Sequence, residues 1–169
     1  MKNQKGFTLI ELLIVIAIIG LLATLAIVSL TSAQQRARDT KRVSDMRSLQ
    51  TAFELYYNDK AIYPVLSDGT DTWVELQTKM KTYVNDILPL DPNDSNGDAY
   101  VYLTNNTDQY VIGATLEDTA HKALEQDIDA AQGGAGWMSV TSTDTYDGVD
   151  ATLNCDAAVY CLSGNASGS

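Results

Sequence analysis

The sequence predicts an α+β protein in which one long N-terminal helix packs, through its second half, against a small antiparallel sheet. Between residues 7 and 60 there is no proline, and Gly20 is the only glycine, so nothing in this stretch is expected to break a helix. Beyond residue 100, short runs rich in Tyr and Val alternate with turn-forming residues. This alternation is typical of short antiparallel strands.

The predicted helix runs from about Thr8 to Asn58 and changes character half way. Residues 7–30 contain a single charged side chain, Glu11, and about 20 apolar residues suffice to cross a bilayer as a helix. In the second half, apolar residues recur every three or four positions, which gives one apolar face. That face comprises Val43, Met46, Leu49, Phe53, Tyr56 and Tyr57, and we place Arg42, Asp45, Arg47 and Glu54 on the opposite, polar face.

The charge is distributed unevenly along the 169 residues, whose formal net charge is -11. Residues 1–60 carry eight Lys/Arg and five Asp/Glu, a net of +3, whereas residues 61–169 carry a net of -14. Such an acidic chain does not fit a nucleic-acid reader that relies on a basic surface. One His and two Cys are too few for a structural zinc site. His121 is interpreted as a surface residue, and no catalytic set is recognised, so the chain is not expected to be an enzyme.

The acidic remainder is predicted to alternate short elements with loops. A short amphipathic helix is expected over residues 73–83, and a hairpin is expected from Tyr100–Leu103 and Gln109–Thr115. Residues 116–128 are interpreted as a loop with a helical turn. Further strands are expected at Trp137–Thr141, Val149–Leu153 and Ala157–Leu162, followed by a frayed end at Ser163–Ser169.

Two ordinary interpretations of the apolar segment fit it incompletely. A secretory signal peptide would use Lys2 and Lys5 as its basic start, but the apolar run exceeds the usual length and lacks a clear cleavage site. A simple membrane anchor explains the length but not Glu11. A carboxylate costs about 2.5–3.5 kcal/mol at the centre of a membrane helix. The cost is lower near the helix start, yet such a residue still indicates a function.

A third interpretation comes from the residues at the start of the helix. Lys5-Gly6-Phe7-Thr8-Leu9-Ile10-Glu11, followed by an unbroken apolar helix, resembles the N-terminus of type IV pilins and of the related type II secretion pseudopilins. The resemblance implies that a prepilin peptidase cuts between Gly6 and Phe7 and that the new amino group of Phe7 is N-methylated. It also implies that Glu11 assists assembly by facing the Phe7 amine of a neighbouring subunit. A nearby cation would offset much of the cost of a carboxylate in hydrocarbon.

The resemblance implies a four-part chain: a leader (1–6), a transmembrane and filament-core helix (7–30), the amphipathic half of the same helix (31–60) and a globular head (61–169). The implied function is a structural subunit of a type IV pilus, used for adhesion, motility or DNA uptake. The subunit would sit in the inner membrane as a single-pass protein and then join a helical homo-oligomer on a pilus assembly platform, ending in an extracellular filament. One alternative is a major pseudopilin of a type II secretion system. Another, of a different class, is a membrane-tethered binding or sensor domain.

The charges that flank the apolar segment favour the opposite orientation, with the head in the cytoplasm. Five basic residues follow it, Arg36, Arg38, Lys41, Arg42 and Arg47, against two lysines and the amino terminus before it. Because cytoplasmic flanks usually carry the Lys/Arg excess, charge counting alone places the head in the cytoplasm. The leader motif and the paired cysteines favour an exported head, and we adopt that orientation.

Two further predictions concern the head. Cys155 and Cys161 are expected to form a disulfide in an exported domain, as pilins often pin their C-terminal region in this way. Asp91, Asp94 and Asp98 lie in an oxygen-rich loop and are weak calcium candidates. The loop does not match the EF-hand register, so solvated turns are the preferred interpretation and no cofactor is expected.

Overall fold

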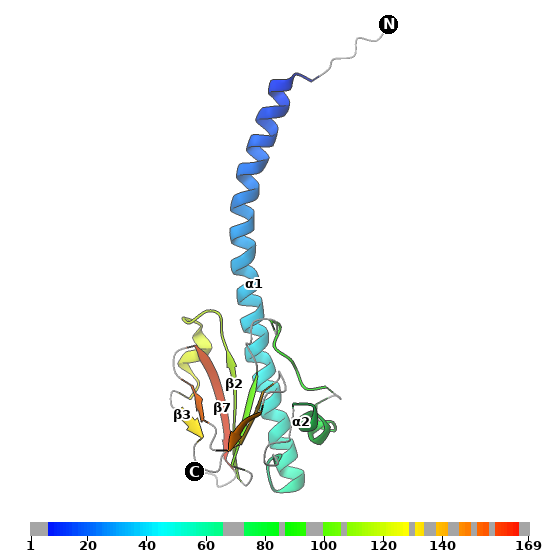
Figure 1. The fold of residues 1–169 in the computed structure, drawn as a ribbon, viewed down its shortest axis with the longest axis vertical. Coiled ribbons are helices and arrows are strands. Elements are labelled where there is room, and N and C mark those ends of the chain that lie inside the picture. Colours follow the sequence, from blue (N-terminus) through cyan, green and yellow to red (C-terminus); the bar gives the residue numbers. More distant parts are fainter. Residues whose placement is uncertain are drawn as a thin grey trace. The chain divides into compact units, whose positions relative to one another are not determined.

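The computed structural model describes residues 7–65, 73–84, 87–93, 100–105, 108–128, 131–133, 138–141, 146–149, 152–155 and 158–165. The chain divides into two compact units, residues 1–37 and 38–169, which are treated separately below. The elements in Figure 1 are α1 (Leu9–Lys60), α2 (Trp73–Met80), β1 (Val101–Thr104), β2 (Gln109–Thr115), the 3-10 helix η2 (Lys122–Glu125), β3 (Ala131–Gly133), β4 (Met138–Thr141), β5 (Tyr146–Val149), β6 (Thr152–Asn154) and β7 (Val159–Asn165).

The long helix is confirmed, because α1 extends without interruption over 52 residues. In the first unit its large apolar side chains are exposed, from 50% at Val15 to 84% at Leu9. By length and composition α1 is able to cross a membrane. A helix that is apolar on all sides must be covered by lipid or by other helices, and no other part of the described chain covers this one.

In the second unit, α1 contributes one buried stripe to the core of the head. Met46, Leu49 and Phe53 are at most 1% exposed, and the Phe53 ring stacks on Tyr102 with centroids 4.7 Å apart. The helix ends at Lys60, and the next residue, Ala61, has a left-handed φ of 59° and donates its N–H to the Tyr57 carbonyl at 2.7 Å. This is the usual backbone of a helix C-terminus.

The main sheet has five strands in the order β5-β4-β1-β2-β7, and β3 pairs with β6 in a separate two-stranded sheet. Every pairing is antiparallel. The predicted hairpin is present as β1 and β2, with Tyr102 opposite Ile112 and Leu103 opposite Val111. The helix on an antiparallel sheet confirms the predicted α+β pilin fold.

Alternate residues of the sheet serve two different clusters, as the pleat of a strand requires. Tyr102, Tyr110, Ile112 and Tyr160 join the stripe of α1 in the main core. Their sequence neighbours Leu103, Val111 and Cys161 join Cys155 in a second, smaller cluster. The sheet of the head is therefore buried on both faces where β1, β2 and β7 lie side by side.

The last strands differ from the prediction. The segment 149–153, expected as one strand, contributes to two sheets: Val149 is the last residue of β5, and Thr152 and Leu153 belong to β6, while residues 150–151 lie outside the described residues. The end expected to fray from Ser163 is wrong for residues 163–165, because β7 pairs with β2 as far as Asn165 opposite Gln109. Gly164 lies opposite Tyr110, where an added Cβ would overlap the Tyr110 ring. The pairing of β7 with β2 at this position therefore requires a residue without a side chain, although a glycine near the end of a sequence suggests a loop.

Candidate functional site

The start of α1 carries a reciprocal cap formed by Thr8 and Glu11. The Thr8 backbone N–H and hydroxyl donate to Glu11 Oε2 at 2.8 and 2.6 Å, and the Glu11 N–H donates to Thr8 Oγ1 at 3.3 Å. This capping box satisfies two N–H groups that a helix start otherwise leaves open. It also places the carboxylate at the positive end of the helix dipole.

The capping box leaves Glu11 able to meet a cation from outside. Its Oε1 accepts no hydrogen bond from the described residues, and Phe7 beside it is the most exposed large apolar side chain of the described chain. Gly6 and the rest of the predicted leader lie outside the described residues. The pairing of Glu11 with a neighbouring Phe7 amine therefore stays a prediction that this geometry permits.

A buried ionic network joins α1 to two segments of the head. Arg42 donates Nε and Nη2 to the two oxygens of Asp91 at 2.7 and 2.9 Å, and Nη1 to Asp39 and Glu117 at 2.8 and 2.9 Å. Arg38 makes a second two-point pair with Glu117, with both distances 2.6 Å. Asp39 in turn accepts the backbone N–H groups of Glu117 and Asp118, each at 2.9 Å.

The network is closed to solvent at its centre. The side chains of Arg42 and Asp39 are fully buried, and that of Asp91 is 1% exposed. Burial by itself would lower the pKa of Arg42, but the hydrogen bonds that it donates to Asp91 and Asp39 raise its pKa overall. The hydrogen bond from Arg38 lowers the pKa of Glu117 to about 2. Arg42 and Glu117 are therefore charged at neutral pH, and each has partners of opposite charge within hydrogen-bonding distance, as burial requires.

The sequence does not predict this network, and the placement of Arg42 on the polar face opposite the apolar stripe is wrong, because its side chain is fully buried. The spacing of these residues in the sequence nevertheless indicates that Asp39 and Arg42 are buried. Asp39, Arg42, Met46, Leu49 and Phe53 follow one another at intervals of three and four residues, which is one helix face. The two charges thus continue the apolar stripe toward the N-terminus, where a buried pair of charges needs partners from elsewhere in the chain.

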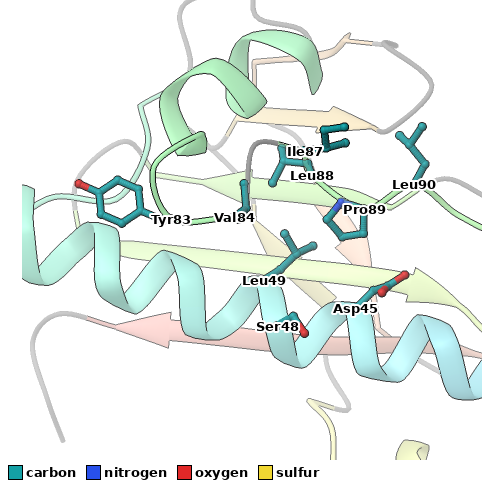
Figure 2. Close-up of a pocket in the computed structure, with 9 residues that line it drawn as sticks. All are labelled: Asp45, Ser48, Leu49, Tyr83, Val84, Ile87, Leu88, Pro89 and Leu90. Carbon is teal, nitrogen blue, oxygen red and sulfur yellow. The ribbon is translucent and has the colours of Figure 1, made fainter.

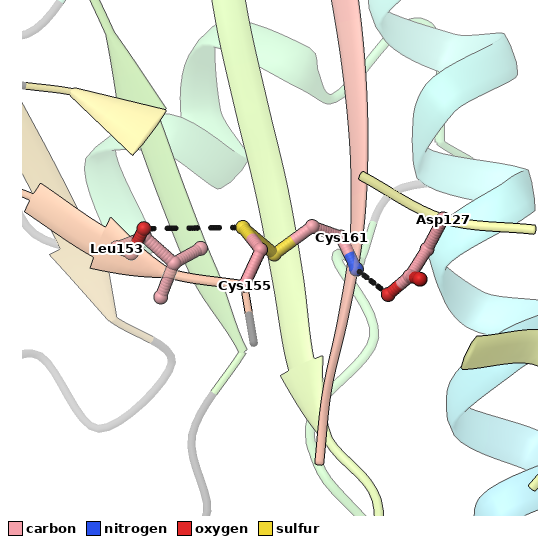
Figure 3. Close-up of a disulfide and its surroundings, with 4 residues drawn as sticks. All are labelled: Asp127, Leu153, Cys155 and Cys161. Atoms are coloured by element: carbon pink, nitrogen blue, oxygen red, sulfur yellow. Dashed lines mark hydrogen bonds between the residues drawn. A yellow bond between two sulfur atoms is a disulfide. The ribbon is translucent and has the colours of Figure 1, made fainter. Parts of the chain in front are cut away.

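The predicted disulfide is present and lies in the second cluster of the head (Figure 3). Cys155 and Cys161 are 1% and 0% exposed, with their Cα atoms 5.8 Å apart. The Cys161 N–H donates to Asp127 Oδ2 at 3.2 Å, and the Cys161 carbonyl accepts from the Ile128 N–H at 3.4 Å. The segment after η2 therefore hydrogen-bonds to β7, while the disulfide ties β7 to the chain just after β6.

A pocket of about 450 Å³ lies between α1 and the segment that leads away from α2 (Figure 2). Its walls are mainly apolar, and Ile87 and Leu90 are 69% and 45% exposed. The Asp45 carboxylate already accepts from Lys41 Nζ and from the Tyr100 hydroxyl, both at 2.8 Å, and Ser48 donates to the Ser44 carbonyl. The lining residues are Asp45, Ser48, Leu49, Tyr83, Val84, Ile87, Leu88, Pro89 and Leu90.

The remaining sequence candidates have structural surroundings of their own. Asp91, a calcium candidate, is occupied by Arg42 and by the Asn93 N–H. Asp94 and Asp98 lie outside the described residues. Within the described ranges, no group of three or more His, Cys, Asp or Glu side chains is arranged to hold a metal ion. His121 caps η2, because its Nδ1 accepts the Ala123 N–H at 3.1 Å.

The fold and the capped apolar helix together define a pilin-like protein, with an N-terminal helix that needs lipid or other helices and a head built on its second half. Sequence comparison agrees: residues 1–27 match the prokaryotic N-terminal methylation motif, and residues 29–131 match the family "Type II secretion system, protein G". The second match covers more than half of the chain. The chain therefore belongs to the protein G family of type II secretion systems.

Individual relatives carry the same name. The type II secretion system core protein G of Pseudomonas aeruginosa is 32% identical over 124 residues, which are 67% of this chain and 85% of the relative. The protein of Vibrio cholerae is 29% identical over 125 residues, 68% of this chain and 83% of the relative. That of Escherichia coli is 40% identical over 76 residues, which span 52% of the relative. No solved structure matches this chain.

These relatives decide between two of the predicted functions at the level of family. A type IV pilus subunit was the first expectation and a type II secretion pseudopilin the alternative. The comparisons favour the alternative. The family match ends at residue 131, before both cysteines, so the disulfide-bonded end of the head lies beyond the matched region.

Proposed function

We propose that this chain is a non-catalytic structural subunit of the filament of a type II secretion system. It is stored in the inner membrane through residues 7–30 and then extracted into a helical assembly of identical subunits on the periplasmic side. There the apolar helices cover one another, and the heads face outward. Repeated head-to-tail contacts that do not close generate such a filament.

The observation that carries this proposal is the uncovered apolar half of α1, with Glu11 as its single charged side chain. Such a surface is stable only in lipid or among like helices. The match of residues 1–27 to a methylation motif supports cleavage between Gly6 and Phe7 by a prepilin peptidase, followed by methylation of the Phe7 amine. Glu11 then pairs with that amine of the subunit ahead and sets the axial position of each incoming chain.

A substitution at Glu11 tests this role. Glu11→Gln keeps the shape of the side chain and removes the charge, so we expect membrane insertion and head folding to persist and filaments to be lost. Glu125→Gln, an exposed position on η2, is the matched control. The measurement is the yield of sheared filaments, with export of a secreted enzyme as a second readout. Normal filaments from Glu11→Gln would contradict the assembly role.

A type IV pilus subunit remains the second candidate, on the strength of one feature. The C-terminal disulfide lies outside the matched family region and resembles the way pilins pin their C-terminal region. Deletion of the gene separates the two functions. Loss of protein export with intact surface pili supports the secretion filament, whereas loss of adhesion, motility or DNA uptake with normal export supports the pilus.

A further inference from the structure

Residues 36–47 form a basic collar directly after the apolar run of α1. It contains Arg36, Arg38, Lys41, Arg42 and Arg47 against Asp39 and Asp45, a net charge of +3. Arg36 follows Leu30, the last residue of the apolar run, by only six positions. A Lys or Arg side chain close to an anionic lipid surface is attracted to it by about 1 kcal/mol, and this attraction acts on either side of a bilayer that carries anionic headgroups. An extended or unfolded head would leave this collar free to bind such a surface.

The folded head removes much of that positive charge. Asp91 and Glu117 come from outside the helix and bring the collar from +3 to +1. They also occupy the guanidinium groups directly: Arg42 is fully buried by Asp39, Asp91 and Glu117, and the Arg38 side chain is 28% exposed while Glu117 holds it at two points. The lowered pKa of Glu117 keeps its carboxylate charged even in mildly acidic solution.

We propose that the basic collar is a latent binding segment for anionic lipid headgroups and that folding of the head masks it. Before the head folds, the collar holds the new subunit at the lipid surface. Once the head has folded, two of the five cations are withdrawn and the subunit leaves the bilayer more easily. This inference rests on the proposed function, because masking matters only for a subunit that is stored in a membrane and then extracted.

The size of the effect follows from the number of cations released. Each Lys or Arg near an anionic surface strengthens binding by about fivefold. Loss of the Glu117 carboxylate frees Arg38 and leaves Arg42 with one partner fewer, so we expect lipid binding to rise about fivefold or more. The gain should shrink as salt is added, because surface charges are screened within about 8 Å at physiological ionic strength.

The test compares the full chain and its variants in nanodiscs with equal amounts of phosphatidylglycerol and phosphatidylcholine. Native mass spectrometry counts the lipids of each kind that stay bound. Glu117→Gln should retain severalfold more phosphatidylglycerol than the wild type, whereas Glu125→Gln, which removes the same charge away from the collar, should not. An unchanged count for Glu117→Gln, or an equal rise for both variants, overturns the proposal.

A rescue variant separates masking from damage to the fold. In Arg38→Gln/Glu117→Gln the ion pair is still broken, but the freed guanidinium is gone, so the phosphatidylglycerol count should fall back toward the wild-type value. Near-ultraviolet circular dichroism reports whether each head has folded. If Glu117→Gln unfolds the head, Arg42 is released as well, so the phosphatidylglycerol count should rise further. An unchanged phosphatidylglycerol count in an unfolded variant also overturns the proposal. Filament yield is measured in a separate experiment. The lipid count can therefore be interpreted even if Glu11→Gln still forms filaments.

Discussion

Arg42 and Asp91 form a two-point ion pair in the core of the head, with Nε–Oδ2 and Nη2–Oδ1 distances of 2.7 and 2.9 Å. The two residues are 49 positions apart in the sequence, and both side chains are almost completely buried. The pair fixes the segment 87–93 against α1. Because Arg42 also donates to Glu117, its side chain joins α1 to segment 87–93 and to the residues that follow β2.

Removal of one partner of this pair should destabilise the head strongly. Asp91→Asn leaves the Arg42 charge buried with one compensating carboxylate fewer, and breaking a buried pair in this way costs about 3–5 kcal/mol. Asp59→Asn is the matched control, because Asp59 pairs with Lys60 where both side chains are more than half exposed, and exposed pairs contribute about 0–1 kcal/mol. Urea unfolding of the full chain in detergent, followed by tryptophan fluorescence with the buried Trp73 as reporter, measures both. Equal loss of stability in the two variants would contradict the assigned role.

The same network makes the stability of the head depend on pH. Glu117 has a pKa of about 2 in the folded head and an ordinary value of 4.5, so its contribution is complete above pH 4.5 and is lost as the pH falls toward 2. We expect the loss to be roughly 2 kcal/mol after allowance for solvent screening. Unfolding curves across this range should show the slope in the wild type and a smaller slope in Glu117→Gln. A wild-type slope that persists in the variant would assign it to other carboxylates.

Sequence patterns predicted the elements whose residues repeat regularly. The uninterrupted helix and the β1–β2 hairpin could be predicted because a 3.6-residue period and a two-residue period report directly on backbone geometry. The pairing of Arg42 with Asp91 could not be predicted, because contact across 49 residues depends on how the loop before β1 returns to the helix. Gly164 and Asn165 belong to β7 for a similar reason: their strand is determined by its partner β2 and not by their own propensity.

The network also bears on the charge pattern that pointed to a cytoplasmic head. Counting residues treats Arg38 and Arg42 as free cations, whereas the folded head pairs both with carboxylates from distant positions. The positive-inside rule counts Lys and Arg and gives Asp and Glu little weight, so it takes no account of this pairing. In the folded chain, therefore, the flank is far less basic than its sequence.

Reduction of the disulfide should destabilise the head without changing its main core. Cys155 and Cys161 close a loop of six residues in sequence separation, and such a short loop contributes on the order of 2–3 kcal/mol. We expect Cys155→Ser/Cys161→Ser to unfold at lower urea and to lose the mobility difference between reducing and non-reducing gels. The wild type with added reductant is the internal comparison. Since the disulfide belongs to the second cluster, the stacking of Phe53 on Tyr102 should survive in both samples.

The end of α1 offers a substitution that should stabilise the protein. Ala61 adopts a φ of 59°, a left-handed conformation that costs a residue with a Cβ about 1–2 kcal/mol and costs glycine almost nothing. We therefore expect Ala61→Gly to raise the free energy of unfolding by about 0.5–1 kcal/mol, after the greater chain entropy of glycine in the unfolded state is subtracted.

Ala37→Gly, at an exposed position inside α1, makes the same chemical change where the backbone is helical. It should lower the stability of the helix by about 1 kcal/mol. Urea unfolding and helix content by far-ultraviolet circular dichroism distinguish the two cases. Changes of the same sign at both positions would show that the left-handed turn at Ala61 does not govern how the helix ends.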